Sequence, residues 1–84
     1  MKNDSLNTQI LLCLSRRKTG MSEKTLKAET MIGYDDAMLT TEEWRDAIRF
    51  LEDKAMVESF ADLMGDTVWT ITDMGLAYLR EKGL

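Results

Sequence analysis

The last third of the chain restricts the fold most, because its pattern changes from helical to extended and back within about thirty residues. An amphipathic segment ends near Lys54, and residues 57–60 and 67–71 follow, rich in β-branched and aromatic side chains. Gly65-Asp66 supplies a turn between the two runs, and Thr72 can cap a final helix. The pattern therefore predicts a helix, a strand, a turn, a strand and a helix, in that order.

The segment before the two strands carries the clearest helix start in the chain. Thr40 and Glu43 have the spacing of a capping box, and Leu39 and Trp44 have the spacing of a hydrophobic staple. An apolar stripe follows at helical spacing, and it consists of Trp44, Ala47, Ile48 and Leu51. Both signals predict a helix that begins after Thr40 and buries this stripe.

Two further helices are predicted upstream. The first begins at Asp4 or Ser5, which can cap it, and continues through apolar residues at helical spacing to a basic end at residues 16–18. Gly20 can adopt the left-handed conformation of a helix end.

The second of these helices begins after Ser22 and closes at Gly33, with Leu26 and either Thr30 or Met31 facing inward. Residues 33–38 are expected to form a loop.

Two short motifs resemble the winged-helix family. Lys54-Ala55-Met56-Val57 stands where such domains have a charged residue, a glycine, a leucine and a valine, and Ile71-Thr72-Asp73-Met74-Gly75 matches the entry into their last helix. Because Ala55 replaces the glycine, we expect a less sharply turned helix end. The resemblance extends from about Leu6 to Leu79, and in length the chain is similar to small bacterial or prophage winged-helix proteins.

The resemblance implies a mostly α fold with a small β-hairpin (α+β), a winged helix-turn-helix with three helices, two strands and a fourth helix. A third short strand before the second helix is left open. With 84 residues, the chain is expected to form a single domain over residues 1–84.

Composition argues against an enzyme. The chain has one cysteine and no histidine, so it can form no intramolecular disulfide, no zinc site of the usual type and no histidine-based acid–base centre. Asp35-Asp36 is a tight carboxylate pair, but turn formation explains it better than a metal. We therefore predict no catalytic residues, no cofactor and no metal.

The surroundings of Cys13 and the absence of a long apolar segment give three more expectations. Cys13 lies in the apolar run 10–14 and is expected to be buried, although the neighbouring Arg16 and Arg17 leave a reactive thiol open. The same run is too short to span a bilayer, and no signal peptide is recognisable. We expect a cytoplasmic protein that does not enter membranes.

Basic side chains gather in the first third of the chain. Residues 1–27 have a net charge of +4 and residues 28–84 a net charge of −8. In the winged-helix family, the start of the second helix often contacts phosphate and the third helix enters the major groove. The candidates for phosphate contact are Arg16, Arg17, Lys18, Lys24 and Lys27, which can lie near each other, and those for base contact are Arg45 and Arg49.

The third helix itself opposes DNA binding. Its predicted outer face carries Glu42, Asp46, Arg49 and Asp53, and the segment between Met56 and Val68 has acidic residues but no Lys or Arg. A solvated helix face, of which ion pairs at helical spacing such as Asp46 with Arg49 are typical, is the plainer interpretation of these charges.

An acidic surface for a protein partner is the other interpretation, joined by exposed apolar groups at the turn. Its candidate residues are Glu42, Asp46, Phe50, Asp53, Leu63 and Met64. The leading hypothesis is a small non-enzymatic regulatory or accessory protein that acts on DNA or within a DNA-bound assembly. The alternative is a protein-interaction module, self-associating or binding another protein, without direct DNA binding.

Overall fold

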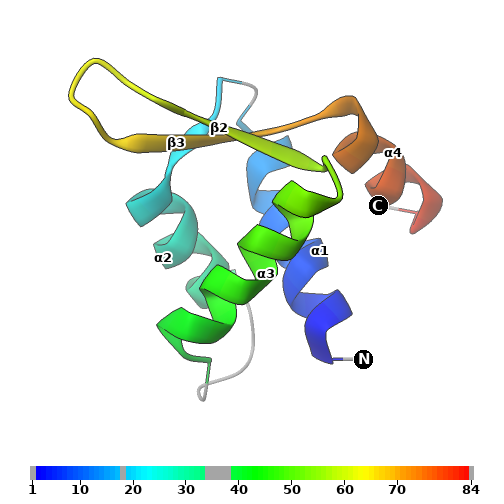
Figure 1. The fold of residues 1–84 in the computed structure, drawn as a ribbon. Helices are drawn as coiled ribbons and strands as arrows, with labels where there is room; N and C mark the ends of the chain where they lie inside the picture. Colours follow the sequence, from blue (N-terminus) through cyan, green and yellow to red (C-terminus); the bar gives the residue numbers. More distant parts are fainter. Residues whose placement is uncertain (1, 18, 34–38, 84) are drawn as a thin grey trace.

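A computed structural model describes residues 2–17, 19–33 and 39–83. It has four helices and three strands in an order that confirms the expected winged-helix topology, with the third strand present (Figure 1). The elements are α1 Lys2–Ser15, β1 Met21–Ser22, α2 Glu23–Gly33, α3 Thr41–Asp53, β2 Val57–Ala61, β3 Thr67–Ile71 and α4 Asp73–Glu81.

The sheet lies across one end of the helices, and its far end projects past them (Figure 1). It is antiparallel, with strand order β1-β3-β2. In β2, Val57 pairs with Ile71 and Ala61 with Thr67, while Met21 of β1 pairs with Trp69. Val57 is buried and the rest of β2 is exposed. The hairpin is therefore anchored at its root and surrounded by solvent at its tip.

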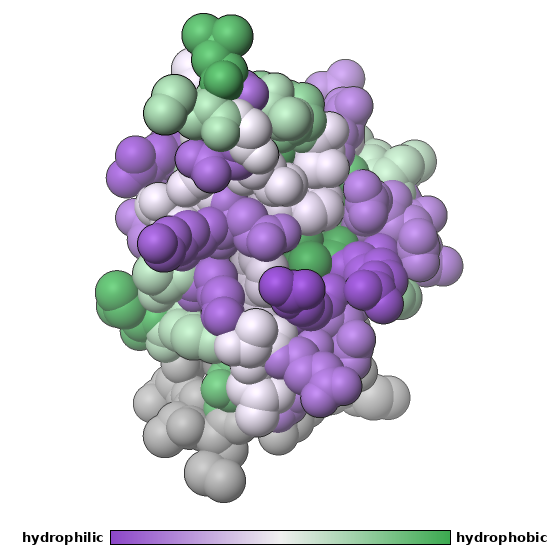
Figure 2. Space-filling model, turned by 60° about the vertical axis from the view of Figure 1, so that its left-hand side comes forward, coloured by the Kyte–Doolittle hydropathy of each residue, from purple (hydrophilic) through white to green (hydrophobic). Residues whose placement is uncertain are grey.

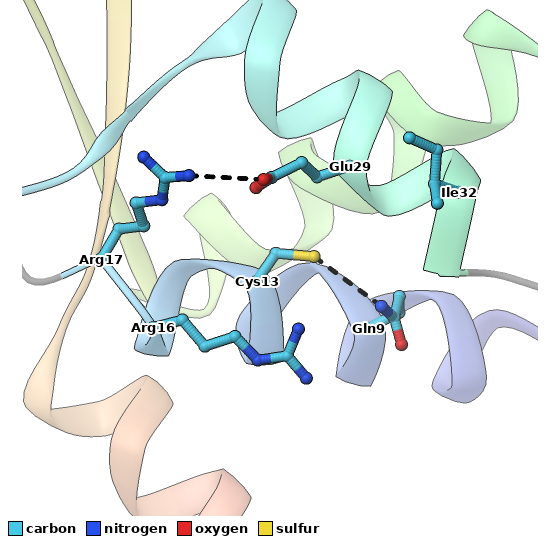
Figure 3. Close-up of a pocket in the computed structure, with 6 residues that line it drawn as sticks. All are labelled: Gln9, Cys13, Arg16, Arg17, Glu29 and Ile32. Atoms are coloured by element: carbon cyan, nitrogen blue, oxygen red, sulfur yellow. Dashed lines mark hydrogen bonds and ion pairs between the residues drawn. The ribbon is translucent and has the colours of Figure 1, made fainter.

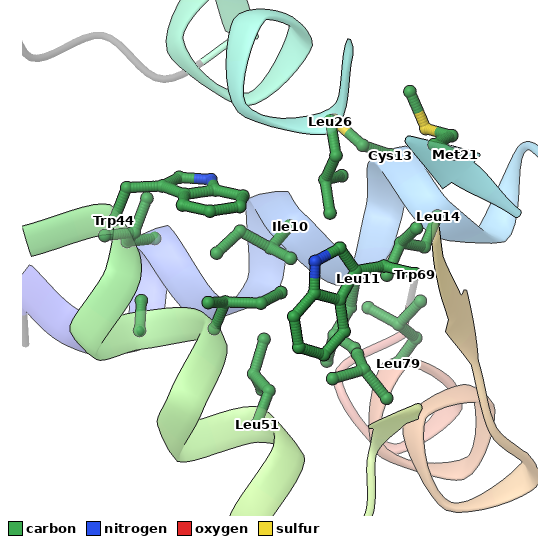
Figure 4. Close-up of a cluster of buried hydrophobic side chains, with 14 residues drawn as sticks. Ile10, Leu11, Cys13, Leu14, Met21, Leu26, Trp44, Leu51, Trp69 and Leu79 are labelled. Carbon is green, nitrogen blue, oxygen red and sulfur yellow. The ribbon is translucent and has the colours of Figure 1, made fainter. Parts of the chain in front are cut away.

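The core fills the space between α1, α2, α3 and the root of the sheet (Figure 4). Ile10, Leu11 and Leu14 of α1 are fully buried, as is Leu26 of α2. The predicted stripe of α3 is buried along its whole length. Of the two residues left open in α2, Thr30 faces inward, and its hydroxyl donates to the Leu26 carbonyl oxygen at 2.7 Å.

Both predicted threonine caps are present. The Thr40 hydroxyl accepts a hydrogen bond from the Glu43 backbone N–H at 3.1 Å, and the Thr72 hydroxyl accepts one from the Gly75 N–H at 3.2 Å. The Thr72 hydroxyl also donates to the Ala55 carbonyl oxygen. Side-chain oxygens thus satisfy backbone donors that a helix start leaves free, which explains why α3 and α4 begin where the sequence indicates.

Two sequence predictions about helix ends were wrong. The first helix begins at Lys2, so Asp4 and Ser5 lie within it, because a residue able to cap a helix does not oblige the helix to start there. The turn after α3 is as sharp as a glycine turn, since Ala55 adopts φ 60° and takes the left-handed conformation itself. That conformation costs a residue with a Cβ about 1–2 kcal/mol.

The positive φ expected at Gly20 is present, at 95°, but it serves strand packing and not a helix end. A Cβ at Gly20 would lie 2.7 Å from the Thr70 Cγ2 and 2.9 Å from the Trp69 carbonyl oxygen. Gly20 therefore lets the chain cross β3 closely enough for β1 to pair with it. None of the described helices is long and apolar enough to cross a membrane.

Candidate nucleic-acid interface

Four basic residues on α2 and α3 lie along one side of the molecule. The Lys27 Nζ donates to the Thr41 Oγ1 at 2.7 Å, which ties α2 to the first turn of α3. Arg45 and Arg49 follow Thr41 at intervals of one helical turn each, so they extend the same flank of α3. Lys24 lies one turn before Lys27 on α2. We call Lys24, Lys27, Arg45 and Arg49 the basic strip.

A shallow hollow of about 180 Å³ lies beside the two arginines. Its other lining residues include Ile48, Glu52 and Trp69. Glu23 also lines it, and the Glu23 Oε1 accepts a hydrogen bond from the Trp69 Nε1 at 3.2 Å. Because this carboxylate is already bound to an indole, it is less available to Arg45 and Arg49, and both guanidinium groups remain exposed.

Lys24 lies at the other end of the strip, near the turn of the hairpin. It lines a second hollow of about 440 Å³ together with Glu23, Ser22, Thr25, Gly65, Asp66 and Thr67. The basic strip therefore extends from α3 along the start of α2 toward the hairpin. Figure 2 looks onto the side of the molecule that lies at the left of Figure 1, and the surface over the helices is mainly hydrophilic there.

The acidic side chains of α3 lie on its outer side. Glu42, Asp46 and Asp53 are all exposed, as predicted. Among the described residues, none of the expected ion pairs of Arg45 or Arg49 with these carboxylates is formed. The individual pairs are therefore absent, but the side chains extend into solvent, as on the solvated helix face that their spacing indicated. We call Glu42, Asp46 and Asp53 the acidic ridge.

The predicted phosphate candidates do not form one cluster. The Arg17 Nη2 lies 3.5 Å from the Glu29 Oε1, across a hollow between α1 and α2 that Arg16 also lines (Figure 3). Lys27 points instead to the start of α3. The expectation that these basic residues lie together was wrong because Lys27 and Glu29, which are two residues apart on α2, point to different sides of the helix. Lys18 lies outside the described residues, as do Asp35 and Asp36.

The predicted partner surface is also divided. Leu63 and Met64 are 105% and 85% exposed at the hairpin tip, where Figure 2 shows hydrophobic atoms gathered at the top. Phe50 is 46% exposed on α3, one turn after Asp46 and beside the acidic ridge, with the Lys54 Nζ 5.6 Å from its ring centre. The acidic ridge lies along α3, away from the hairpin tip. The candidates therefore belong to two surfaces.

Cys13 is buried, as expected, and it lies on the floor of the hollow between α1 and α2 (Figure 3). Burial raises the pKa of its thiol above the ordinary value, and the Gln9 Nε2 donates to its sulfur at 3.7 Å. A thiol with a raised pKa is mostly protonated at neutral pH, so it is a weak nucleophile. The described residues contain no group of three or more side chains that could hold a metal ion.

Comparison with known proteins supports the architecture. No family model matches the chain, and no curated protein does. A solved structure, the crystal structure of a MarR-family transcriptional regulator from Silicibacter pomeroyi, superimposes with a TM-score of 0.74. The match covers 92% of this chain at 17% identity, and it covers 47% of the other chain, so the present chain corresponds to about half of that regulator.

The chain has a winged-helix fold. The β2–β3 hairpin is its wing. The sequence analysis did not single out several exposed apolar residues, among them Phe60 on the wing and Ile32 at the end of α2, which are 51% and 85% exposed. Strand alternation starting from the buried Val57 would have placed Phe60 on the outer face, whereas no sequence signal marked Ile32.

Proposed function

We propose that this chain is a small, non-enzymatic, single-domain regulatory protein that binds duplex DNA through the basic strip. The observation that carries the proposal is the hydrogen bond from Lys27 to Thr41, which places α2 beside the first turn of α3 and aligns Lys27 with Arg45 and Arg49. The solved neighbour is a transcriptional regulator, and this agrees with such a role.

Charge decides how α3 would approach DNA. Arg45 and Arg49 of the basic strip line a hollow beside Glu23 of α2, together with Glu52, whereas the acidic ridge, which borders Arg49, lies on the outer side of α3. Phosphates attract the first and repel the second, so the proposed complex has the helix rotated toward α2, with the ridge near the edge of the groove. Arg45 and Arg49 would then read bases, because arginine is the commonest side chain to bind guanine, and Lys24 and Lys27 would contact phosphate.

The binding test is a fluorescence-anisotropy titration of labelled random-sequence duplex at about 50 and about 200 mM salt. Four cationic contacts predict a log–log salt slope of about −3 to −4. Arg45→Ala with Arg49→Ala should weaken binding at least about tenfold and make the slope shallower by about 2 units. The matched control is Arg80→Ala with Lys82→Ala, which removes the same charge from the end of α4 and the residue after it, on the other side of the molecule (Figure 1).

An equal loss of affinity in the α4 control would overturn the assignment to the basic strip, since it would indicate a general charge effect. The same titration on Arg16→Ala with Arg17→Ala tests the sequence-based phosphate candidates. Because these side chains lie on the α1–α2 side, we expect a smaller loss than for the strip variant. A larger loss would place DNA on that side instead.

A second function, a protein-interaction module, is favoured by the exposed carboxylates of the acidic ridge. Such a partner would present a basic surface to Glu42, Asp46 and Asp53. The anisotropy titration separates the two functions. An absence of binding to duplex even at about 50 mM salt would reject DNA as the ligand and leave the acidic ridge as the binding surface.

A further inference from the structure

The tip of the wing carries acidic side chains, which repel DNA, and apolar side chains, whose exposure to water is unfavourable. Leu63 and Met64 extend almost fully into solvent, and the nearest ionisable groups of the turn are the carboxylates of Asp62 and Asp66. No Lys or Arg occurs in the wing, so it has no group that attracts phosphate. Apolar side chains bordered by acid are typical of a protein contact.

A second surface has the opposite character. The hollow between α1 and α2 has a volume of about 410 Å³, and it is lined by Gln9, Cys13, Arg16, Arg17, Glu29 and Ile32. In Figure 3, Arg16 and Arg17 occupy one end and Ile32 the other, with Cys13 between them. The volume is within the range of pockets that hold small ligands, roughly 300–1,000 Å³, and is large enough for two aliphatic side chains.

The two surfaces complement each other in polarity and in charge. We propose that the wing tip of one copy of this chain docks into the α1–α2 hollow of a second copy. Leu63 and Met64 would cover Ile32 and the Cys13 floor, and the carboxylates of Asp62 and Asp66 would lie against Arg16 and Arg17. Apolar burial would supply most of the affinity, and the charge pairs would set the orientation.

The ion pair already in the hollow does not block this contact. Arg17 and Glu29 are 3.5 Å apart, with side chains 56% and 41% exposed. Exposed pairs of this kind contribute at most about 1 kcal/mol, so the Arg17 guanidinium can exchange Glu29 for a carboxylate of the arriving tip. No ion pair of Arg16 is formed among the described residues, which leaves its charge available.

The contact must join two molecules. Ladder pairs hold the wing in register with β3 from Val57–Ile71 to Ala61–Thr67, so the tip cannot fold back to the α1–α2 hollow of its own chain. Because the tip and the hollow are different surfaces, the contact is head-to-tail, and the complex as a whole leaves one tip and one hollow unoccupied. A contact through two apolar side chains and two carboxylates is expected to bury much less than the roughly 800 Å² per partner of stable complexes, so we expect a dissociation constant in the high micromolar range.

The experiment is sedimentation velocity without DNA, from about 10 μM to about 1 mM protein. The wild type should show a weight-average mass that rises continuously with concentration. A tip variant, Leu63→Asp with Met64→Asp, and a hollow variant, Ile32→Asp with Arg16→Glu, should each remain monomeric. Met74→Asp on α4 is the matched control, because Met74 is 57% exposed and outside both surfaces, and it should associate like the wild type.

Mixing the two variants gives the sharpest test. The tip variant keeps an intact hollow and the hollow variant keeps an intact tip, so an equimolar mixture should form a one-to-one dimer that grows no further. A mixture that stays monomeric, or a wild type that is monomeric at about 1 mM, would overturn the proposal. Circular dichroism melts of each variant establish that a loss of association is not a loss of fold. The readout contains no DNA and is independent of the proposed DNA binding.

Discussion

The α2–α3 side and the wing differ in what their exposed residues offer. The first presents Lys24, Lys27, Arg45 and Arg49 on elements packed against the core, whereas the wing has no cation and ends in two exposed apolar side chains. In the winged-helix family both regions are expected to contact DNA. Here their chemistry separates them, since one suits phosphate and the other suits an apolar protein surface.

This difference shows that fold and partner are set by different positions. Buried residues such as Val57 and Trp69 fix the wing in place, and they would do so whatever the exposed residues were. The exposed positions of the same hairpin are free to vary without cost to the fold. Similarity to a solved winged helix therefore extends to the shape of the wing but not to what the wing contacts.

The largest expected effect concerns the root of the wing. Trp69 is 6% exposed. Trp69→Ala should lower the free energy of unfolding by about 3–5 kcal/mol, because the substitution leaves a cavity and removes the hydrogen bond from the Trp69 Nε1 to Glu23. Phe60→Ala is the control on the same hairpin. Phe60 is half exposed, and its removal should cost less than about 1 kcal/mol in urea denaturation. If Phe60→Ala lowered the free energy of unfolding as much as Trp69→Ala, the buried root of the wing would not be more important for stability than its exposed part.

A positive charge introduced into the wing should make the wing more similar to the basic α2–α3 side in its affinity for DNA. Asp66→Lys adds a positive charge beside the hollow that Lys24 lines, so DNA affinity at about 50 mM salt should rise several-fold and the salt slope should steepen by about 1 unit. Glu81→Lys on α4 makes the same charge change far from the strip. If Glu81→Lys raised affinity equally, net charge alone would explain the result.

The junction between α3 and the wing is strained at Ala55. Ala55→Gly should raise the free energy of unfolding by about 0.5–1 kcal/mol, because glycine adopts φ 60° without the steric cost of a Cβ. Ala61→Gly, in the extended β2, is the opposite control and should destabilise by a similar amount. Thermal denaturation compares the two, and a destabilised Ala55→Gly variant would disprove the strain.

The smallest effect is expected at the wing tip. Leu63→Ser with Met64→Ser should change the free energy of unfolding by less than about 0.5 kcal/mol in dilute solution, since neither side chain has core contacts to lose. Chemical denaturation at about 5 μM measures this below the proposed association. A loss above about 1 kcal/mol would mean that the tip supports the fold.

Local signals in the sequence predicted most of the fold. The capping box at Thr40 and the cap at Thr72 set the starts of α3 and α4, and the apolar stripe of α3 gave its buried face. These succeed because caps and periodicity act within one or two turns. The left-handed Ala55 could not be predicted from propensity, because the packing around the turn imposes a conformation that alanine avoids by itself.

The candidate site was less predictable, because it depends on which helix faces are neighbours. The net charge of residues 1–27 grouped Arg17 with Lys27, but Arg17 lies against Glu29 on one side of α2, and Lys27 extends from another side of α2 toward Thr41. For the same reason the α1–α2 hollow could not be predicted, because its lining residues Gln9 and Ile32 come from different helices. Sequence spacing gives positions on one helix, and only tertiary packing brings two helices together.

The turn at the tip of the wing is held by one side chain. The Asp62 Oδ1 accepts hydrogen bonds from the backbone N–H groups of Met64 and Asp66, each at 2.9 Å, and the Asp62 N–H donates to the Asp66 carbonyl oxygen. The loop is therefore preorganised before any partner arrives, and covering it would cost little backbone conformational entropy. Nearly all of the free energy gained by burying the two apolar side chains at the tip would then contribute to affinity. Asp62 adds no apolar area to the contact, but its hydrogen bonds would determine how little of that free energy is lost to ordering the loop.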